Sequence, residues 1–187
     1  MAAQALVDSA IAFCNDSLVQ HLRLDSQRAQ PGTAEFDVTP PPSQAIARVL
    51  RVWIDGCEIH ATPSDCINDG LASTGWPRTF YTQQNSSVLS ALLYPIPDAA
   101  YLIQVEVATR PLRNAKSLEN DLFDLWMEPI VEGAKARLMA IPDQPFSNPG
   151  MAGAAAANAM YLSRKARIEG SYGRTRAAGR VQMRPLA

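Results

Sequence analysis

The spacing of apolar residues changes twice along this chain of 187 residues, and this change limits the folds open to it. At both ends, apolar side chains recur every three or four residues, a pattern that predicts amphipathic helices. Between residues 34 and 108, apolar and polar residues alternate and turn-forming residues separate the runs, which predicts strands. We therefore expect an α+β protein in which a β-rich unit is inserted between helices.

The first predicted helix covers residues 3–24, with His21 and Arg23 near its end, where the helix dipole favours positive charge. The second follows Ser117, a good N-cap. Its apolar stripe contains Pro129, which predicts a kink because proline lacks a backbone donor and clashes with the carbonyl four residues earlier. The third is rich in alanine and runs from about Pro149, after a cap at Ser147 or Asn148, to about residue 168.

Two hairpins are predicted in the middle of the chain. Asp55-Gly56 lies between apolar runs and favours a type I′ turn, which requires positive φ at both central residues. Residues 83–87 form the turn of the second hairpin. The expected strands cover residues 34–38, 47–54, 57–59, 79–82, 88–94 and 101–107.

These elements define an expected architecture. It is an α-helical bundle built from residues 1–30 and 110–168, with an inserted antiparallel β-rich subdomain at residues 31–109. An extended basic C-terminal arm follows at residues 169–187, and we expect it to become ordered only on a partner.

The net charge of −1 hides a strong asymmetry. Residues 164–187 hold seven basic residues against Glu169 alone, a net charge of +6, so the remainder carries −7. Such a tail is typical of an arm that binds an acidic protein surface or nucleic acid. Only Tyr161 and Tyr172 could add base stacking, so a protein partner is the favoured reading.

The sequence offers little for catalysis. Cys14, Cys57 and Cys66 have no zinc spacing, and no motif surrounds His21 or His60, so we expect no catalytic, metal or cofactor site and no enzyme activity. No phosphate-binding loop is present. No apolar run approaches the roughly 20 residues that cross a bilayer, and the start has no signal peptide, so synthesis in a cytoplasm is expected.

Three motifs carry a resemblance to a known family. Gly133 to Pro142 reads GAKARL-x-A-x-P, Pro145 to Pro149 reads PxSNP, and residues 48–59 read RVLRVWIDGCEI, after a helix that contains Phe13-Cys14. In this order the motifs resemble those of the phage head-to-tail adaptor proteins, the connectors related to the tail tubular proteins of short-tailed phages. Phe146 departs from the family pattern, where tryptophan is expected, and the alanine-rich helix carries fewer charges than usual.

The resemblance implies a structural virion protein located at the neck, at the portal vertex, and made in the host cytoplasm. Twelve copies would form a ring beneath the portal protein and receive the tail or nozzle protein on the opposite face. Genomic DNA would pass through the channel without sequence-specific binding. The C-terminal arm would clasp the portal through Arg164, Lys165, Arg167, Tyr172, Arg174, Arg176, Arg180 and Arg184.

Three alternatives remain at this point. The first is a neck or tail-completion protein of a long-tailed phage, which differs in the partner on its lower face. The second is a nucleic-acid-binding accessory protein, which predicts DNA binding with steep salt dependence. The third is a hydrolase with an unrecognised site, which predicts an activity that depends on His21 or His60.

Overall fold

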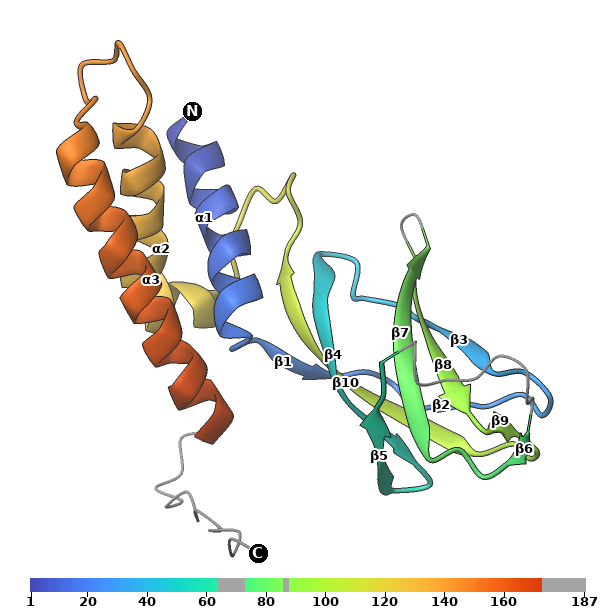
Figure 1. Cartoon of the computed structure of the whole chain (residues 1–187). Coiled ribbons are helices and arrows are strands. Elements are labelled where there is room, and N and C mark those ends of the chain that lie inside the picture. The colour runs from blue at the N-terminus through green and yellow to red at the C-terminus, as the bar shows by residue number, and fades with distance from the viewer. Residues whose placement is uncertain (64–72, 86–87, 173–187) are drawn as a thin grey trace, which may run out of the picture. The chain divides into compact units, whose positions relative to one another are not determined.

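The computed structural model describes residues 1–63, 73–85 and 88–172 (Figure 1). Three helices and a curled mixed sheet are present in this part of the chain, so the predicted α+β class is confirmed. The chain divides into two compact units. The helical unit combines Met1–Val19 with Lys116–Ala187, and the β unit is Gln20–Ala115.

The helical unit contains α1 (Ala2–Ser17), α2 (Asn120–Met139) and α3 (Pro149–Tyr172), which lie side by side in Figure 1. The prediction that the first helix reaches residue 24 was wrong. Leu18 adopts a left-handed backbone conformation with φ of 54° and ends the helix. His21 and Arg23 therefore lie on strand β1 (His21–Arg23) instead of at a helix end.

Helix α2 has the predicted kink. Trp126 has φ of −131° and ψ of 23°, outside the helical range, three residues before Pro129. The proline ring would collide with the carbonyl of Leu125 in a straight helix, so the backbone bends at this point. The predicted cap at Ser117 was wrong, because the N-cap residue is Glu119 and the helix begins at Asn120.

Helix α3 packs through small side chains. The Asn148 side-chain oxygen accepts a hydrogen bond of 3.1 Å from the Met151 amide, which confirms one of the two predicted caps. The helix continues past residue 168 to Tyr172. A Cβ atom at Gly170 would lie 3.3 Å from a methyl carbon of Val19, so this end of α3 lies close to Val19. The buried residues on its inner face are Ala152, Ala155, Ser163 and Ala166.

The helical core is small and aromatic at one end. Phe13 of α1 and Trp126 of α2 are in contact, with ring centroids 5.8 Å apart. The other buried members of the core are Ala10, Cys14, Leu122, Ile130 and Ala166.

Helices α1 and α2 approach closely at Ser9 and Gly133. The buried Ser9 hydroxyl donates a 2.7 Å hydrogen bond to the Ile130 carbonyl. A Cβ atom at Gly133 would collide with this hydroxyl oxygen. The first glycine of the GAKARL motif is therefore a residue that allows two helices to meet.

Ten strands are present in the described residues of the β unit. Besides β1 they are β2 (Gln27–Arg28), β3 (Glu35–Val38), β4 (Gln44–Ile54), β5 (Cys57–Ala61), β6 (Thr74–Gly75), β7 (Thr79–Asn85), β8 (Val88–Tyr94), β9 (Ile96–Pro97) and β10 (Leu102–Pro111). The main sheet has the order β1-β10-β4-β5-β7-β8-β3. Strand β2 also pairs with β10, at Leu102 and Ile103, whereas β1 pairs with residues 106–108 of the same strand. β6 and β9 form a separate short pair.

Both predicted hairpins are present. Ile54 pairs with Cys57 across the first turn, where Asp55 has φ of 48° and Gly56 has φ of 83°. Strands β7 and β8 pair antiparallel in the second hairpin, but the predicted turn at residues 83–87 was too long, because residues 83–85 are part of β7 and pair with β8. The expectation of an entirely antiparallel sheet was wrong, because β5 and β7 pair in parallel. Parallel neighbouring strands cannot be joined by a tight turn and need a longer connection.

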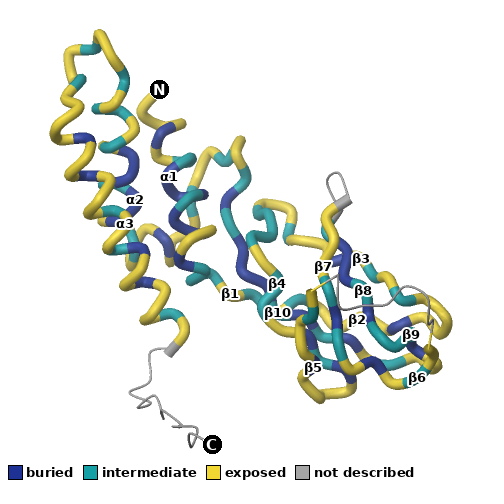
Figure 2. The backbone as a smooth tube through the Cα atoms, in the orientation of Figure 1, coloured by how far each residue is buried: buried dark blue, intermediate teal, exposed yellow. Residues whose placement is uncertain are grey.

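The curled sheet encloses its own core. Figure 2 shows the buried residues along its strands. The largest fully buried side chains here include Ile54, Ile103, Val38, Val52 and Val107. Leu22 and Leu24 pack against this core, which explains why these two residues belong to the β unit and not to α1.

Candidate partner-binding surfaces

The C-terminal half of α3 carries an exposed basic surface. Arg164, Lys165 and Arg167 are all exposed. The Lys165 ammonium lies 3.9 Å from a Glu169 carboxylate oxygen, with both side chains more than half exposed (60% and 52%). A surface pair of this kind contributes little, so the positive charge remains available to a partner.

Apolar side chains accompany these charges. Tyr161 is 66% exposed, and Met160 and Ile168 are each 58% exposed. Aromatic residues, methionine and arginine are enriched in protein interfaces. Tyr172 is the last residue of α3. The other predicted contact residues lie outside the described part of the chain: Arg174, Arg176, Arg180 and Arg184.

The first half of α2 carries a second exposed apolar surface, which the sequence did not reveal. Phe123, Leu125 and Met127 are 59%, 48% and 49% exposed. Leu125 belongs to the predicted apolar stripe but is half exposed, because the kink at Trp126 changes the phase of the helix. The carboxylates around this surface belong to Asp121, Asp124 and Glu128, which are exposed.

The first half of α3 is exposed without being charged. No charged residue occurs from Gln144 to Ser163. Met151 is 56% exposed, and most of its alanine neighbours on the outer face of α3 are exposed too. A helix without charge on its outer face is normally covered by another surface, so this face is a candidate for a subunit contact.

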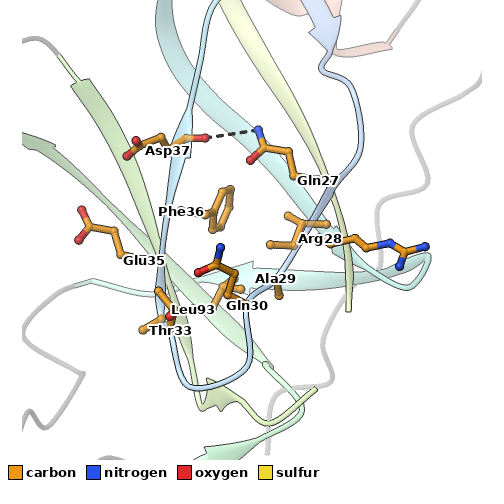
Figure 3. A pocket seen from close by; sticks show the side chains of 11 residues that line it. Gln27, Arg28, Ala29, Gln30, Thr33, Glu35, Phe36, Asp37 and Leu93 are labelled. Atoms are coloured by element: carbon orange, nitrogen blue, oxygen red, sulfur yellow. Dashed lines mark hydrogen bonds between the residues drawn. The ribbon is translucent and has the colours of Figure 1, made fainter. Parts of the chain in front are cut away.

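The β unit has a pocket of about 310 Å³ between β2 and β3 (Figure 3). Its lining includes the apolar residues Ala29, Phe36, Leu93 and Ile103, together with polar residues of β2, β3 and the segment between them. Figure 3 shows the Gln27 side chain reaching across to the Asp37 backbone, where its amide donates to the carbonyl at 3.4 Å. No sequence pattern indicates this pocket, because it depends on how far the sheet curls.

The residues considered for chemistry are dispersed. Cys14 is buried in α1, and Cys57 is exposed in the first hairpin. His21 lies 3.4 Å from the Glu106 carboxylate on the neighbouring strand, and His60 is on β5. Residues 65, 66 and 69 of the predicted polar loop lie outside the described ranges. Within those ranges, no group of three His, Cys, Asp or Glu side chains could hold a metal ion.

Among the described residues, Tyr101 and Glu132 have shifted pKa values. A hydrogen bond from the Tyr101 hydroxyl to the Asp98 carboxylate raises the pKa of Tyr101, with desolvation and the charge of Asp98 acting in the same direction. A 2.7 Å hydrogen bond from Lys135 lowers the pKa of Glu132. Both interactions are local, because the paired residues are three positions apart in the sequence.

Comparison with known families decides the identity. The SU10 adaptor protein family, a family of phage head-to-tail adaptors, matches residues 2–185. The chain belongs to this family. The match covers nearly the whole chain, so it includes both units of the adaptor. Among curated proteins, none matches the chain.

Family membership confirms the predicted resemblance and makes this chain a phage adaptor protein, a structural component of the virion. It implies a location at the virion neck and interactions with the portal and the tail. The described helices include none with the length and hydropathy of a membrane span.

Proposed function

We propose that the adaptor forms a closed ring beneath the portal, links the capsid vertex to the tail, and leaves a channel through which the genome passes. The main support for this proposal is that the helical unit exposes several large apolar side chains in a protein that belongs to an adaptor family. Phe123, Met151 and Tyr161 are each more than half exposed. Distinct surfaces on one subunit can join neighbouring copies in a heterologous contact, which closes into a ring when the rotation between copies permits.

The basic end of α3 is the proposed contact to the portal. Arg164, Lys165 and Arg167 present positive charge next to Tyr161 and Ile168, and the chain beyond α3 continues this basic character. An arm of this composition suits an acidic surface. The role is structural and requires no catalytic group. DNA would pass through the channel without sequence-specific binding.

The proposal is tested by electron microscopy of the purified adaptor mixed with the portal protein of the same phage. We expect a ring of additional density on one face of the portal, and the view also gives the number of copies. The charge-reversed variant Arg164→Glu/Lys165→Glu/Arg167→Glu should bind the portal at least tenfold more weakly, because attraction becomes repulsion.

A matched control carries the same change in charge on the β unit. Arg48→Glu/Arg51→Glu/Arg78→Glu reverses three exposed arginines there and should bind the portal with little change. Absence of a complex between folded proteins at moderate salt would contradict the adaptor ring. If the chain instead bound DNA with an affinity that falls steeply with salt, the nucleic-acid-binding alternative would take its place. A ring that binds both the portal and a tail component of a long-tailed phage would favour the alternative of a neck or tail-completion protein of such a phage.

A further inference from the structure

The first half of α2 exposes most of its side chains. Leu122 is 1% exposed and Trp126 is partly buried, and no basic residue occurs between Lys116 and Lys135. The exposed residues around these two anchors are acidic or apolar, and we name them the α2 surface: Asp121, Asp124, Glu128, Phe123, Leu125 and Met127. No ion pair among the described residues involves the three carboxylates. The α2 surface therefore presents negative charge beside apolar side chains.

A surface of opposite charge lies on the second half of α3. Four exposed residues there have the three-, four- and seven-residue spacing of one helical face, and we name them the α3 surface: Tyr161, Arg164, Lys165 and Ile168. The Lys165 ammonium lies 3.9 Å from the Glu169 carboxylate, and both side chains are exposed. Such a pair contributes little, so the α3 surface keeps its positive charge.

The two surfaces lie at the same level of the helical unit. Leu122 is the buried neighbour of the α2 surface, Ala166 is that of the α3 surface, and both belong to one core cluster. Figure 1 shows the first half of α2 beside the second half of α3. Each surface extends over seven residues, or about two helical turns. Copies that stand side by side with parallel helices can thus bring one surface against the other without sliding along the helix direction.

The two surfaces point in different directions. Each of the three helices packs against the other two, so the outer faces of α2 and α3 lie on different sides of the bundle. Within the described part of the chain, no ion pair joins the two surfaces. One copy can therefore bind one neighbour through its α2 surface and another neighbour through its α3 surface.

We infer that the α2 surface of one copy binds the α3 surface of the next copy. The carboxylates lie against the two cations, and the apolar side chains of α2 pack against Tyr161 and Ile168. Complementary charge selects which surfaces meet, and aromatic residues, methionine and arginine are enriched in protein interfaces. Because the two surfaces differ, the contact repeats from copy to copy in one sense and closes into a ring when the rotation permits.

This inference deepens the proposed function, because it rests on the ring and names the two surfaces that join its subunits. Arg164 also belongs to the proposed portal contact. A guanidinium has five N–H donors, so one arginine can serve a neighbour and the portal together. Arg167 and the chain beyond α3 are outside the α3 surface. The α2 surface has no part in the portal contact, so changes in α2 separate the two proposals.

The test is chemical cross-linking between copies, both in the complex with the portal and in the concentrated free chain. The background Cys57→Ser/Cys66→Ser retains only Cys14, which is buried. In this background the variant Phe123→Cys/Ile168→Cys, treated with a short bismaleimide, should give a ladder of covalent multimers. Each copy then offers one cysteine to each of its two neighbours. A mixture of the two single variants should stop at dimers, and either single variant alone should stay monomeric.

A matched pair of cysteines checks the level of the contact. Phe123→Cys/Met151→Cys also combines one exposed residue of α2 with one of α3. Met151 is 17 residues from Ile168, or about 25 Å along the helix, so this variant should give no ladder. A ladder from the Met151 pair in place of the Ile168 pair would overturn the inference.

Reversal of charge checks the role of the carboxylates. In the cross-linking variant, the yield of multimers should fall at least tenfold when the three acids of the α2 surface are reversed: Asp121→Lys/Asp124→Lys/Glu128→Lys. The matched control reverses three exposed acids of the β unit and should keep the ladder: Glu35→Lys/Asp37→Lys/Glu58→Lys. An equal yield from both charge variants would contradict the assigned pairing.

The outcomes separate this contact from the proposed function. A ring on the portal that gives no ladder would overturn the contact and leave the adaptor ring standing. A ladder from the free chain, with no ring on the portal, would support the contact and contradict the ring beneath the portal. A ladder in neither sample, with no ring on the portal, would contradict both. Dimers alone from the double cysteine variant would indicate an isologous contact and would overturn the inference.

Discussion

The close approach of α1 and α2 makes Gly133→Ala a sharp test of the helical packing. The new methyl group would collide with the Ser9 hydroxyl, which is buried and donates to the Ile130 carbonyl. Strain in a packed core costs about 1–3 kcal/mol, and a buried hydroxyl that loses its acceptor costs about 1–3 kcal/mol. Alanine recovers about 1 kcal/mol of helix propensity. The net loss is about 3 kcal/mol, or roughly 6–12 °C in Tm.

Urea unfolding followed by far-ultraviolet circular dichroism measures this loss, because all three described helices belong to the helical unit. The control is the same substitution in a Ser9→Ala background. In that background the colliding oxygen is absent. The next nearest atoms to the new Cβ are Nη1 of Arg137 at 3.4 Å and the Cβ of residue 9 at 3.5 Å. Gly133→Ala should then be neutral or stabilise by up to about 1 kcal/mol. A loss of equal size in both backgrounds would refute the argument from the Ser9 hydroxyl.

Two further predictions concern the surface. Gly56→Ala should destabilise the β unit by about 1–2 kcal/mol in thermal unfolding, because alanine resists positive φ. Gly153→Ala, on the exposed face of α3, should stabilise the helical unit by up to about 1 kcal/mol. A change of the same sign in both variants would contradict the assigned backbone conformations. Asp98→Asn should lower the pKa of Tyr101 toward 10.0, the value without such contacts. The stabilisation from the Tyr101–Asp98 contact is fully present below the unfolded pKa and is lost as pH rises through the raised folded pKa. Absorbance titration of the wild type against Tyr101→Phe measures this shift, and an unchanged titration in Asp98→Asn would exclude the hydrogen bond as its cause.

Local chemistry explains which elements could be predicted from the sequence. The Asp55-Gly56 turn, the kink before Pro129 and the cap at Asn148 each depend on the covalent properties of one or two residues. Such signals act over a few residues, but they do not always decide the outcome, because the cap signal at Ser117 is not used and α2 begins at Asn120. The helices and most strands followed from the period of their apolar residues, which is set by the geometry of each element.

The misassigned regions depended on distant contacts. Leu18 and Leu22 fit a helical period, but Leu22 and Leu24 also alternate, and packing against the β core decided in favour of a strand. Phe123 and Met127 lie off the predicted apolar stripe, and the exposure of Leu125, next to the kink at Trp126, could not be predicted from that stripe. The pocket between β2 and β3 is absent from any local pattern, because its lining also includes Leu93 and Ile103 from strands distant in the sequence.

The uncharged outer face of α3 also affects how the free protein behaves at high concentration. From Gln144 to Ser163 no side chain is ionised, and the net charge of the chain is only −1. Mutual repulsion between free subunits is therefore weak. Sulfate ions are excluded from such surfaces and strengthen their association. Preparations of the isolated adaptor should accordingly salt out at modest sulfate concentrations, and the choice of buffer anion will decide how much free subunit stays in solution before its partners are added.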